Sequence, residues 1–200
     1  MGKRRKGREI ALLVLVGIDF TGEDPERAFD RFMQEFVLGP EIADTFGEED
    51  PARVFERTRE GFLGGEEVAE FRVQRDPVLS FRELRESVAA EPAMAEFART
   101  LVRGVAARRE EIDALITEAS ENWRLDRMPV VDRNVLRMAV QELIATPDVP
   151  PAVVLNEAIE IAREFGTEAS PAFVNGVLDR VAARVAAGER EERGTSPRSI

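Results

Sequence analysis

The 200-residue sequence contains no cysteine, no histidine and no tyrosine, and only one tryptophan. Without cysteine it forms no disulfide bond, and without cysteine or histidine it lacks the residues that most often bind zinc. The same absences exclude a histidine general base, a thiolate nucleophile and a phenolic acid. An enzyme built from this chain would depend on carboxylates, Lys, Arg, Ser or Thr.

The remaining polar patterns offer little for catalysis. Glu157, Glu160 and Glu164 have a helical spacing that could hold a divalent ion, but an ordinary solvated helix face has the same spacing. The glycines of residues 61–65 lack the Lys-Ser/Thr pair of a phosphate-binding loop, and Ser170 has no base to activate it. The sequence therefore predicts a protein that is not an enzyme and that uses no cofactor or metal.

Long apolar runs are also missing. The apolar stretch from Ile10 to Ile18 is much shorter than the ~20 residues that span a bilayer. It follows basic residues, as the core of a secretory signal does, but Asp19 and the residues after it offer no small-x-small cleavage site. We therefore expect a cytoplasmic protein without a membrane segment.

Negative charge dominates the chain everywhere except at its start. The formal net charge is −11, yet five of the first eight residues are basic: Lys3, Arg4, Arg5, Lys6 and Arg8. Taking these five positive charges away from −11 would leave −16. Such a cluster is typical of contacts with backbone phosphates, whose oxygens a guanidinium can grip in pairs. The alternative interpretation is that these residues are a short solvated tail or the remnant of a signal sequence.

Helical periodicity runs through most of the chain, and no segment alternates as a strand does. The pattern predicts a buried helix over 10–18, a helix from Asp24-Pro25 to Gly39-Pro40, short helices near 52–60 and 81–88, a long helix over 94–119 bent near Gly104, and helices over about 129–143, 151–165 and 171–185. Gly166 is expected in a left-handed conformation at the end of the helix over 151–165. The fold class is all-α, with short-looped helices packed as antiparallel neighbours.

Several ordered blocks carry a family resemblance: RRKGRE at residues 4–9, WRLDR at 123–127, VDRNVLRMA at 131–139, LNEAIEIA at 155–162 and SPAFVNGVLD at 170–179. Together they resemble the NusB family of transcription antitermination factors. Part of this pattern has a simpler explanation, because apolar periodic positions are ordinary core and Gly176 would let two helices approach closely.

The resemblance implies two packed three-helix bundles and an adapter function. Members of the family bind boxA RNA together with the small-subunit ribosomal protein NusE, and the complex joins RNA polymerase in ribosomal RNA operons. It implies RNA contacts at Lys3, Arg4, Arg5, Lys6, Arg8, Gly166, Thr167, Glu168 and Phe173. It implies contacts with the protein partner at Asp126, Asp132 and Arg133. Phe173 would either stack on an unpaired base or belong to the core.

The expected organisation has four parts: a basic segment and first helix over 1–20, the rest of an N-terminal bundle over 21–119, a C-terminal bundle over 120–187, and a disordered tail over 188–200. The N-terminal bundle includes an acidic insertion at about 40–90, which the resemblance does not explain. A helical protein-interaction module that never binds RNA remains the alternative function. The sequence leaves monomer and homodimer both open.

Overall fold

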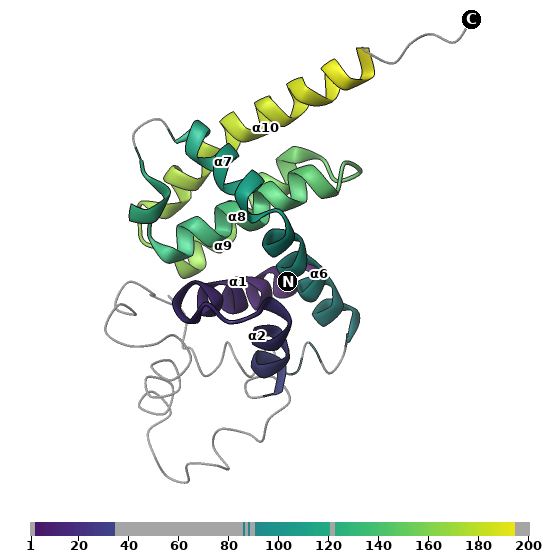
Figure 1. Cartoon of the computed structure of the whole chain (residues 1–200), viewed down its shortest axis with the longest axis vertical. Coiled ribbons are helices and arrows are strands. Elements are labelled where there is room, and N and C mark those ends of the chain that lie inside the picture. The colour runs from purple at the N-terminus through teal and green to yellow at the C-terminus, as the bar shows by residue number, and fades with distance from the viewer. Residues whose placement is uncertain (1–2, 35–85, 87, 89–90, 121–122, 195–200) are drawn as a thin grey trace, which may run out of the picture.

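The computed structural model describes residues 3–34, 86, 88, 91–120 and 123–194 (Figure 1). These residues form seven α-helices, one 3-10 helix and no strand, so the all-α prediction is confirmed. The helices are α1 (Lys3–Thr21), α2 (Pro25–Phe32), α6 (Ala93–Ala107), α7 (Arg109–Ala119), η3 (Leu125–Arg127), α8 (Val130–Ala145), α9 (Pro151–Phe165) and α10 (Ser170–Gly194). The predicted helices near 52–60 and 81–88 lie outside the described residues, apart from Glu86 and Val88.

The helices pack in two groups of three. Helices α1, α2 and α6 contact one another, and α8, α9 and α10 do the same (Figure 1). Helix α7 packs on α8 and α10, while α1 and α6 both contact α8 and so join the groups. This arrangement agrees with the expected pair of three-helix bundles.

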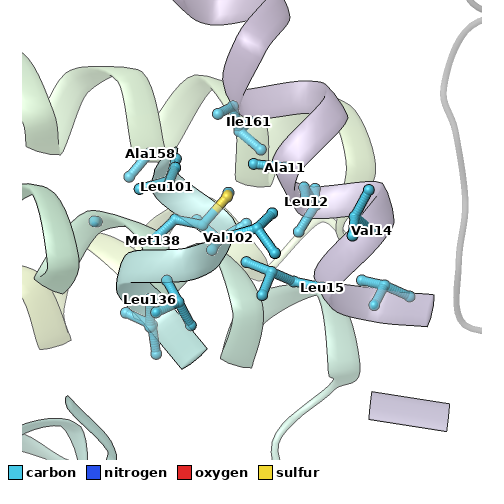
Figure 2. Close-up of a cluster of buried hydrophobic side chains, with 14 of the residues drawn as sticks. Ala11, Leu12, Val14, Leu15, Leu101, Val102, Leu136, Met138, Ala158 and Ile161 are labelled. Atoms are coloured by element: carbon cyan, nitrogen blue, oxygen red, sulfur yellow. The ribbon is translucent and has the colours of Figure 1, made fainter. Parts of the chain in front are cut away.

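Helix α1 lies at the centre of the core because its middle is apolar on every face. Each residue from Ile10 to Val16 is at most 6% exposed, as the periodicity predicted. Figure 2 shows Ala11, Leu12 and Leu15 of α1 among side chains of α6, α8 and α9. No helix of the described part of the chain is long and apolar enough to cross a membrane.

Two helix starts follow directly from local sequence. The Asp24 carboxylate accepts hydrogen bonds from the backbone N–H groups of Glu26 and Arg27, at 3.1 and 3.2 Å. These bonds satisfy two of the N–H groups that open α2, and Pro25 supplies a backbone angle suited to its first position. Pro151 has the same role at the start of α9.

Two expected helix lengths differ from the structure. The predicted helix over 94–119 is interrupted at Arg108, whose φ of −115° and ψ of 23° are not helical, so α6 and α7 are separate. The break lies four residues after Gly104, near the predicted bend. Helix α10 continues to Gly194, beyond the position where the sequence led us to expect a disordered tail.

The glycines also require two corrections. Gly176 does not mediate a close approach, because a Cβ there would meet nothing within 4 Å. Gly166 is not left-handed, since its φ is −95° and its ψ −164°. Crowding explains why a glycine occupies this position, because a Cβ there would lie 2.5 Å from the Ser170 Oγ. Close helix contacts occur instead at Gly7, where a Cβ would lie 2.7 Å from the Phe97 ring, and at Gly104, where a Cβ would clash with the Gln141 side chain of α8.

Candidate functional site

The basic residues at the start of α1 differ sharply in exposure. Arg4 is exposed, and no described residue forms a hydrogen bond or ion pair with its side chain. Arg5 is half-buried and donates to the Glu157 carboxylate of α9 at 2.9 and 3.1 Å. Lys3 begins α1, but its side chain lies outside the described part of the structure.

The side chains of Lys6 and Arg8 point into the protein, although both belong to the basic cluster at the start of the sequence. Arg8 is 4% exposed and donates two hydrogen bonds of 2.7 Å to the Glu142 carboxylate of α8. Lys6 is 6% exposed and pairs with Glu9 at 2.8 Å. A cation held in this way by buried carboxylates is not available to a phosphate. The exposed cation of the described segment is therefore Arg4, with Arg5 at its edge.

The turn between α9 and α10 holds the second group of predicted RNA contacts. Thr167 and Glu168 are exposed at this turn, and Gly166 is buried. The Thr167 N–H donates to the Ser170 Oγ at 2.9 Å, which closes the turn. The first turn of α10 then places Phe173 nearby, half-buried against the core.

Phe173 has an aromatic neighbour that the sequence did not indicate. The Trp123 ring lies edge-on to it, with centroids 5.7 Å apart and planes at 62°. Trp123 is 55% exposed, and it is one of two large hydrophobic side chains exposed among the described residues. The two rings come from distant parts of the sequence and form an aromatic surface beside the turn, suited to stacking on unpaired bases.

The three predicted partner residues occupy different environments. Asp126 of η3 is exposed and accepts two hydrogen bonds from Arg124, at 2.8 and 3.0 Å. Asp132 is 3% exposed because the first turn of α8 packs inward, so it is not presented to a partner. Arg133 is half-buried and donates its Nε–H to Asp19 at 2.8 Å.

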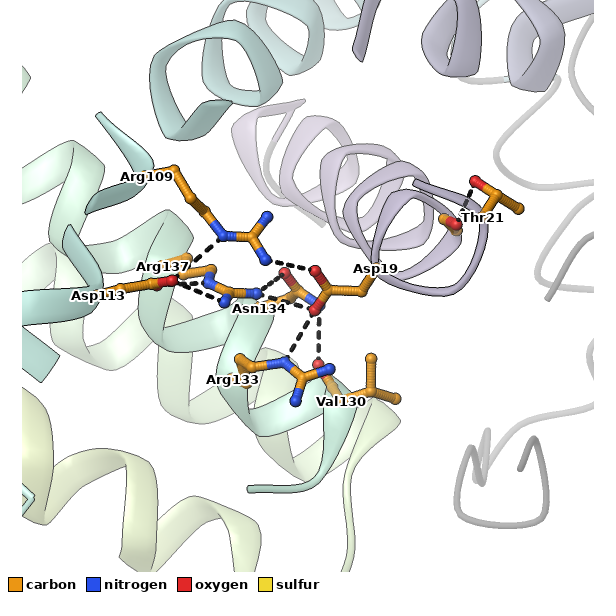
Figure 3. Close-up of polar contacts among 9 residues, drawn as sticks. Asp19, Thr21, Arg109, Asp113, Val130, Arg133, Asn134 and Arg137 are labelled. Atoms are coloured by element: carbon orange, nitrogen blue, oxygen red, sulfur yellow. Dashed lines mark hydrogen bonds and ion pairs between the residues drawn. The ribbon is translucent and has the colours of Figure 1, made fainter. Parts of the chain in front are cut away.

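Arg133 belongs to an ion cluster at the end of α1 that we call the Asp19 cluster: Asp19, Arg109, Asp113, Arg133, Asn134 and Arg137 (Figure 3). Asp19 accepts from Arg109, Arg133 and Arg137 at 2.7–2.8 Å. Asp113 accepts two further bonds from Arg137, at 2.7 and 3.0 Å. The cluster joins α1, α7 and α8 at one point.

The pKa values of the two acids on α1, Glu9 and Asp19, are shifted in opposite directions. Burial by itself raises the pKa of the Asp19 carboxyl, but the charges of Arg137, Arg133 and Arg109 together outweigh it and leave that pKa below its usual value. Burial raises the pKa of Glu9, and the hydrogen bond from Lys6 only partly offsets this. Glu157 shows a lowered pKa, chiefly through its hydrogen bond from Arg5.

The carboxylates at 157, 160 and 164 do not form a metal site. Arg5 and Arg8 bind Glu157, and Arg163 pairs with Glu160. Within the described residues, no group of three acidic side chains is placed to hold an ion. The metal interpretation of this spacing therefore has no structural support.

Sequence reasoning missed the acidic partners of α1 and the ring beside Phe173. No local pattern pairs Glu142 or Glu157 with the start of α1, or Asp19 with the arginines of α7 and α8, because each is an ordinary surface-type residue until its long-range partner is known. Trp123 did carry a signal, since a tryptophan ring combines an apolar body with a polar N–H and is enriched at interfaces.

Comparison with known proteins gives a consistent result. The family model described as "NusB family" matches residues 70–183. The transcription antitermination protein NusB of Myxococcus xanthus is 57% identical over 91 residues, which is 46% of this chain and 65% of that protein. That alignment thus spans just under two thirds of the relative. The NusB of Geotalea uraniireducens is 36% identical over 182 residues, 91% of this chain and 95% of the relative.

Solved structures show the same fold. The NusB structure of T. maritima matches with a TM-score of 0.55 and 31% identity, over 94% of this chain and 96% of that one. A crystal structure of the antitermination factors NusB and NusE with double-stranded RNA matches with a TM-score of 0.55 and 23% identity, over 91% of this chain and 97% of that one. Because a family model matches over half of the sequence and one relative aligns along nearly all of it, the chain belongs to the NusB family of transcription antitermination factors, which are not enzymes.

Proposed function

We propose that this chain binds boxA RNA together with the ribosomal protein NusE, and that the complex joins RNA polymerase in the cytoplasm to suppress termination in ribosomal RNA operons. The match to a NusB protein over 91% of the chain carries this proposal. A related chain of the same fold has been crystallised with NusE and RNA. We assign the RNA contacts to two surfaces of this chain and the protein contact to a third.

The first RNA surface is the exposed start of α1. Arg4 is free to meet a phosphate, and Arg5 could exchange part of its pairing with Glu157 for one. Arg8 supports this surface indirectly, because its buried ion pair with Glu142 fixes the first turns of α1 on α8, whereas Lys6 pairs with Glu9 within α1.

The second RNA surface is the aromatic pair Trp123 and Phe173 with the exposed turn at Thr167 and Glu168. Phosphate contacts position a nucleic acid without reading its sequence, so selectivity requires contact with bases. Stacking on an aromatic ring contributes ~1–3 kcal/mol per base in other proteins. Because Phe173 also packs on the core, Trp123 is the cleaner residue on which to test stacking.

Fluorescence provides a direct assay, because Trp123 is the only tryptophan and no tyrosine is present. Titration with boxA RNA, with and without NusE, should quench the emission, and affinity should be higher with NusE. Trp123→Leu should weaken binding of RNA, measured by its anisotropy, and leave the melting temperature within a few degrees.

The phosphate surface is tested with Arg4→Ala, with Arg27→Ala as the matched control, since Arg27 is also an exposed helical arginine. Arg4→Ala should weaken RNA binding and lower the log–log salt slope by ~0.7, the value for one lost contact to a single strand. RNA bound no better by the pair than by either protein alone would refute the proposed function.

One observation favours the alternative of a helical interaction module without RNA binding. Two of the five basic residues at the start, Lys6 and Arg8, are buried in ion pairs within the protein. That alternative predicts that the chain still binds NusE, but that adding boxA RNA leaves the fluorescence emission of Trp123 unchanged.

A further inference from the structure

A concavity of about 530 Å³ lies where the end of α1 meets α7, η3 and the start of α8. Its wall includes four guanidinium groups, from Arg109, Arg124, Arg133 and Arg137. Only two carboxylates, those of Asp19 and Asp126, share this wall. An excess of arginine over acid in a concave surface favours an anionic ligand.

The arginines keep donors that the protein itself does not use. All three donor nitrogens of Arg137 are bonded, to Asp19, Asp113 and Asn134. Arg133 uses only its Nε, and Arg109 its Nε and one terminal nitrogen, among the contacts of the described residues. Figure 3 shows both terminal nitrogens of Arg133 and one of Arg109 without an interaction.

These donors are held in place before any ligand arrives. Asp19 fixes the Arg133 Nε at 2.8 Å and an Arg109 terminal nitrogen at 2.7 Å, and its own side chain is only 4% exposed. The Arg133 side chain is 19% exposed and thus partly removed from water. A guanidinium that is already ordered and partly desolvated binds an anion at a smaller cost in side-chain entropy.

The other charges of the wall favour a protein carboxylate over an RNA phosphate. Asp126 is 62% exposed beside Arg124, and it would repel the row of phosphates on either side of a bound one. A protein surface avoids this repulsion, because it can place an acid against Arg133 and a basic residue against Asp126.

We propose that this concavity receives an aspartate or glutamate side chain of the protein partner, bound by the free donors of Arg133 and Arg109. The proposal rests on the proposed function, because it assigns the chemistry of the partner contact. It gives the Asp19 cluster a role beyond joining three helices.

The test compares Arg133→Gln with wild type and with Arg163→Gln, an exposed arginine of α9 that undergoes the same change of charge. Arg133→Gln should weaken association with NusE by about ten-fold or more, as loss of one partner of a desolvated charge pair does. The affinity of Arg133→Lys for NusE should lie between those of wild type and Arg133→Gln, since lysine keeps the positive charge but lacks the paired donors of a guanidinium. Arg163→Gln should bind as wild type does.

A double-mutant cycle separates a direct contact from a structural effect. Each Asp and Glu of the partner is changed to its amide and measured against wild type and Arg133→Gln. One amide variant of the partner should bind the wild-type chain more weakly than the unchanged partner does. The same amide substitution should cause little further loss of affinity when it is measured against Arg133→Gln. The proposal would be refuted if, for every acid of the partner, the loss of affinity from the amide substitution simply added to the loss from Arg133→Gln. It would also be refuted if Arg133→Gln bound NusE as tightly as wild type does.

Two further outcomes are distinguishable. If Arg133→Gln reduces binding of boxA RNA without NusE, the concavity is a phosphate site and the carboxylate proposal is wrong. If wild type itself does not associate with NusE, the proposed function fails and this inference fails with it.

Discussion

The two ends of α1 are anchored by ion networks of opposite polarity. At its start the helix contributes cations, and the carboxylates of Glu142 and Glu157 neutralise them. At its end it contributes the Asp19 carboxylate, and arginines of α7 and α8 surround it. The end that the sequence marks as cationic is thus largely neutralised, while the end that looks acidic holds an excess of arginine.

This difference teaches that local charge in a sequence is a poor guide to surface charge when partners are distant. The arrangement also opposes the helix dipole, which favours acids in the first turn and bases in the last. Helix α1 has neither. Its ion pairs with other helices therefore offset an unfavourable local arrangement as well as the cost of burial.

The largest effect should come from breaking the pair at the start of α1. Arg8→Ala leaves the Glu142 carboxylate buried without its cation, and should reduce the free energy of unfolding by about 3–5 kcal/mol. Denaturant titration measures this. Replacing both residues, as Arg8→Met with Glu142→Leu, should recover most of the loss, whereas Arg4→Ala should stay within about 0.5 kcal/mol of wild type. A stable Arg8→Ala protein would show that the two ends are not equivalent anchors.

Asp19→Asn should break the other end with a smaller cost, about 2–3 kcal/mol at pH 7, because the amide still accepts a hydrogen bond. The pKa of Asp19 is lowered on folding, so its contribution is complete above its unfolded value near 3.8 and is lost as the pH falls through the folded value. The difference between wild type and Asp19→Asn should therefore shrink below pH 3.8. A constant difference down to pH 2.5 would contradict the assignment.

Gly7→Ala tests how tightly the start of α1 is seated on α6. A methyl group would lie 2.7 Å from the Phe97 ring and 3.1 Å from the Met94 carbonyl oxygen. Overpacking costs about 1–3 kcal/mol, and alanine returns about 1 kcal/mol of helix propensity. A net loss of about 1–2 kcal/mol is expected by thermal melting, with Gly176→Ala as the control that should be neutral or stabilising.

Glu9→Gln should give the smallest effect and the opposite pH dependence to Asp19→Asn. The pKa of Glu9 is raised on folding by burial, so wild type gains stability as the pH falls through the folded value toward 4.5. The stability of Glu9→Gln relative to wild type should therefore increase as the pH rises above 4.5 and then level off. Denaturation series from pH 3.5 to 7 measure it; a relative stability that decreases with pH would be inconsistent with the raised pKa.

Much of the fold could be predicted from the sequence. Apolar periodicity located the helices, and short-range signals such as Asp24 before Pro25 located their starts, because both depend on neighbours within a few residues. The break at Arg108 was missed since nothing in its side chain stops a helix. The conformation of Gly166 was missed because crowding by Ser170 mimics the requirement for a left-handed residue.

The candidate site could be predicted less well. The burial of Arg8 depends on a carboxylate 134 positions away, and a single sequence does not report such pairs. The aromatic surface likewise joins Trp123, between α7 and η3, to the Phe173 ring of α10. The predicted contact at Asp126 fits an exposed position, but Asp132 shows that a charged residue in a helix can face the core.

The position of α1 also has a consequence for synthesis. This helix is synthesised before the other described helices, yet the carboxylates and arginines of those helices that compensate its charges are made more than 80 residues later. Most of the stability of a helix in a protein comes from tertiary packing of its apolar face rather than from its own propensity. The apolar Ile10–Val16 segment can therefore pack first on α2 and α6, and the ion pairs of α1 with α7, α8 and α9 form only once those later helices have been made.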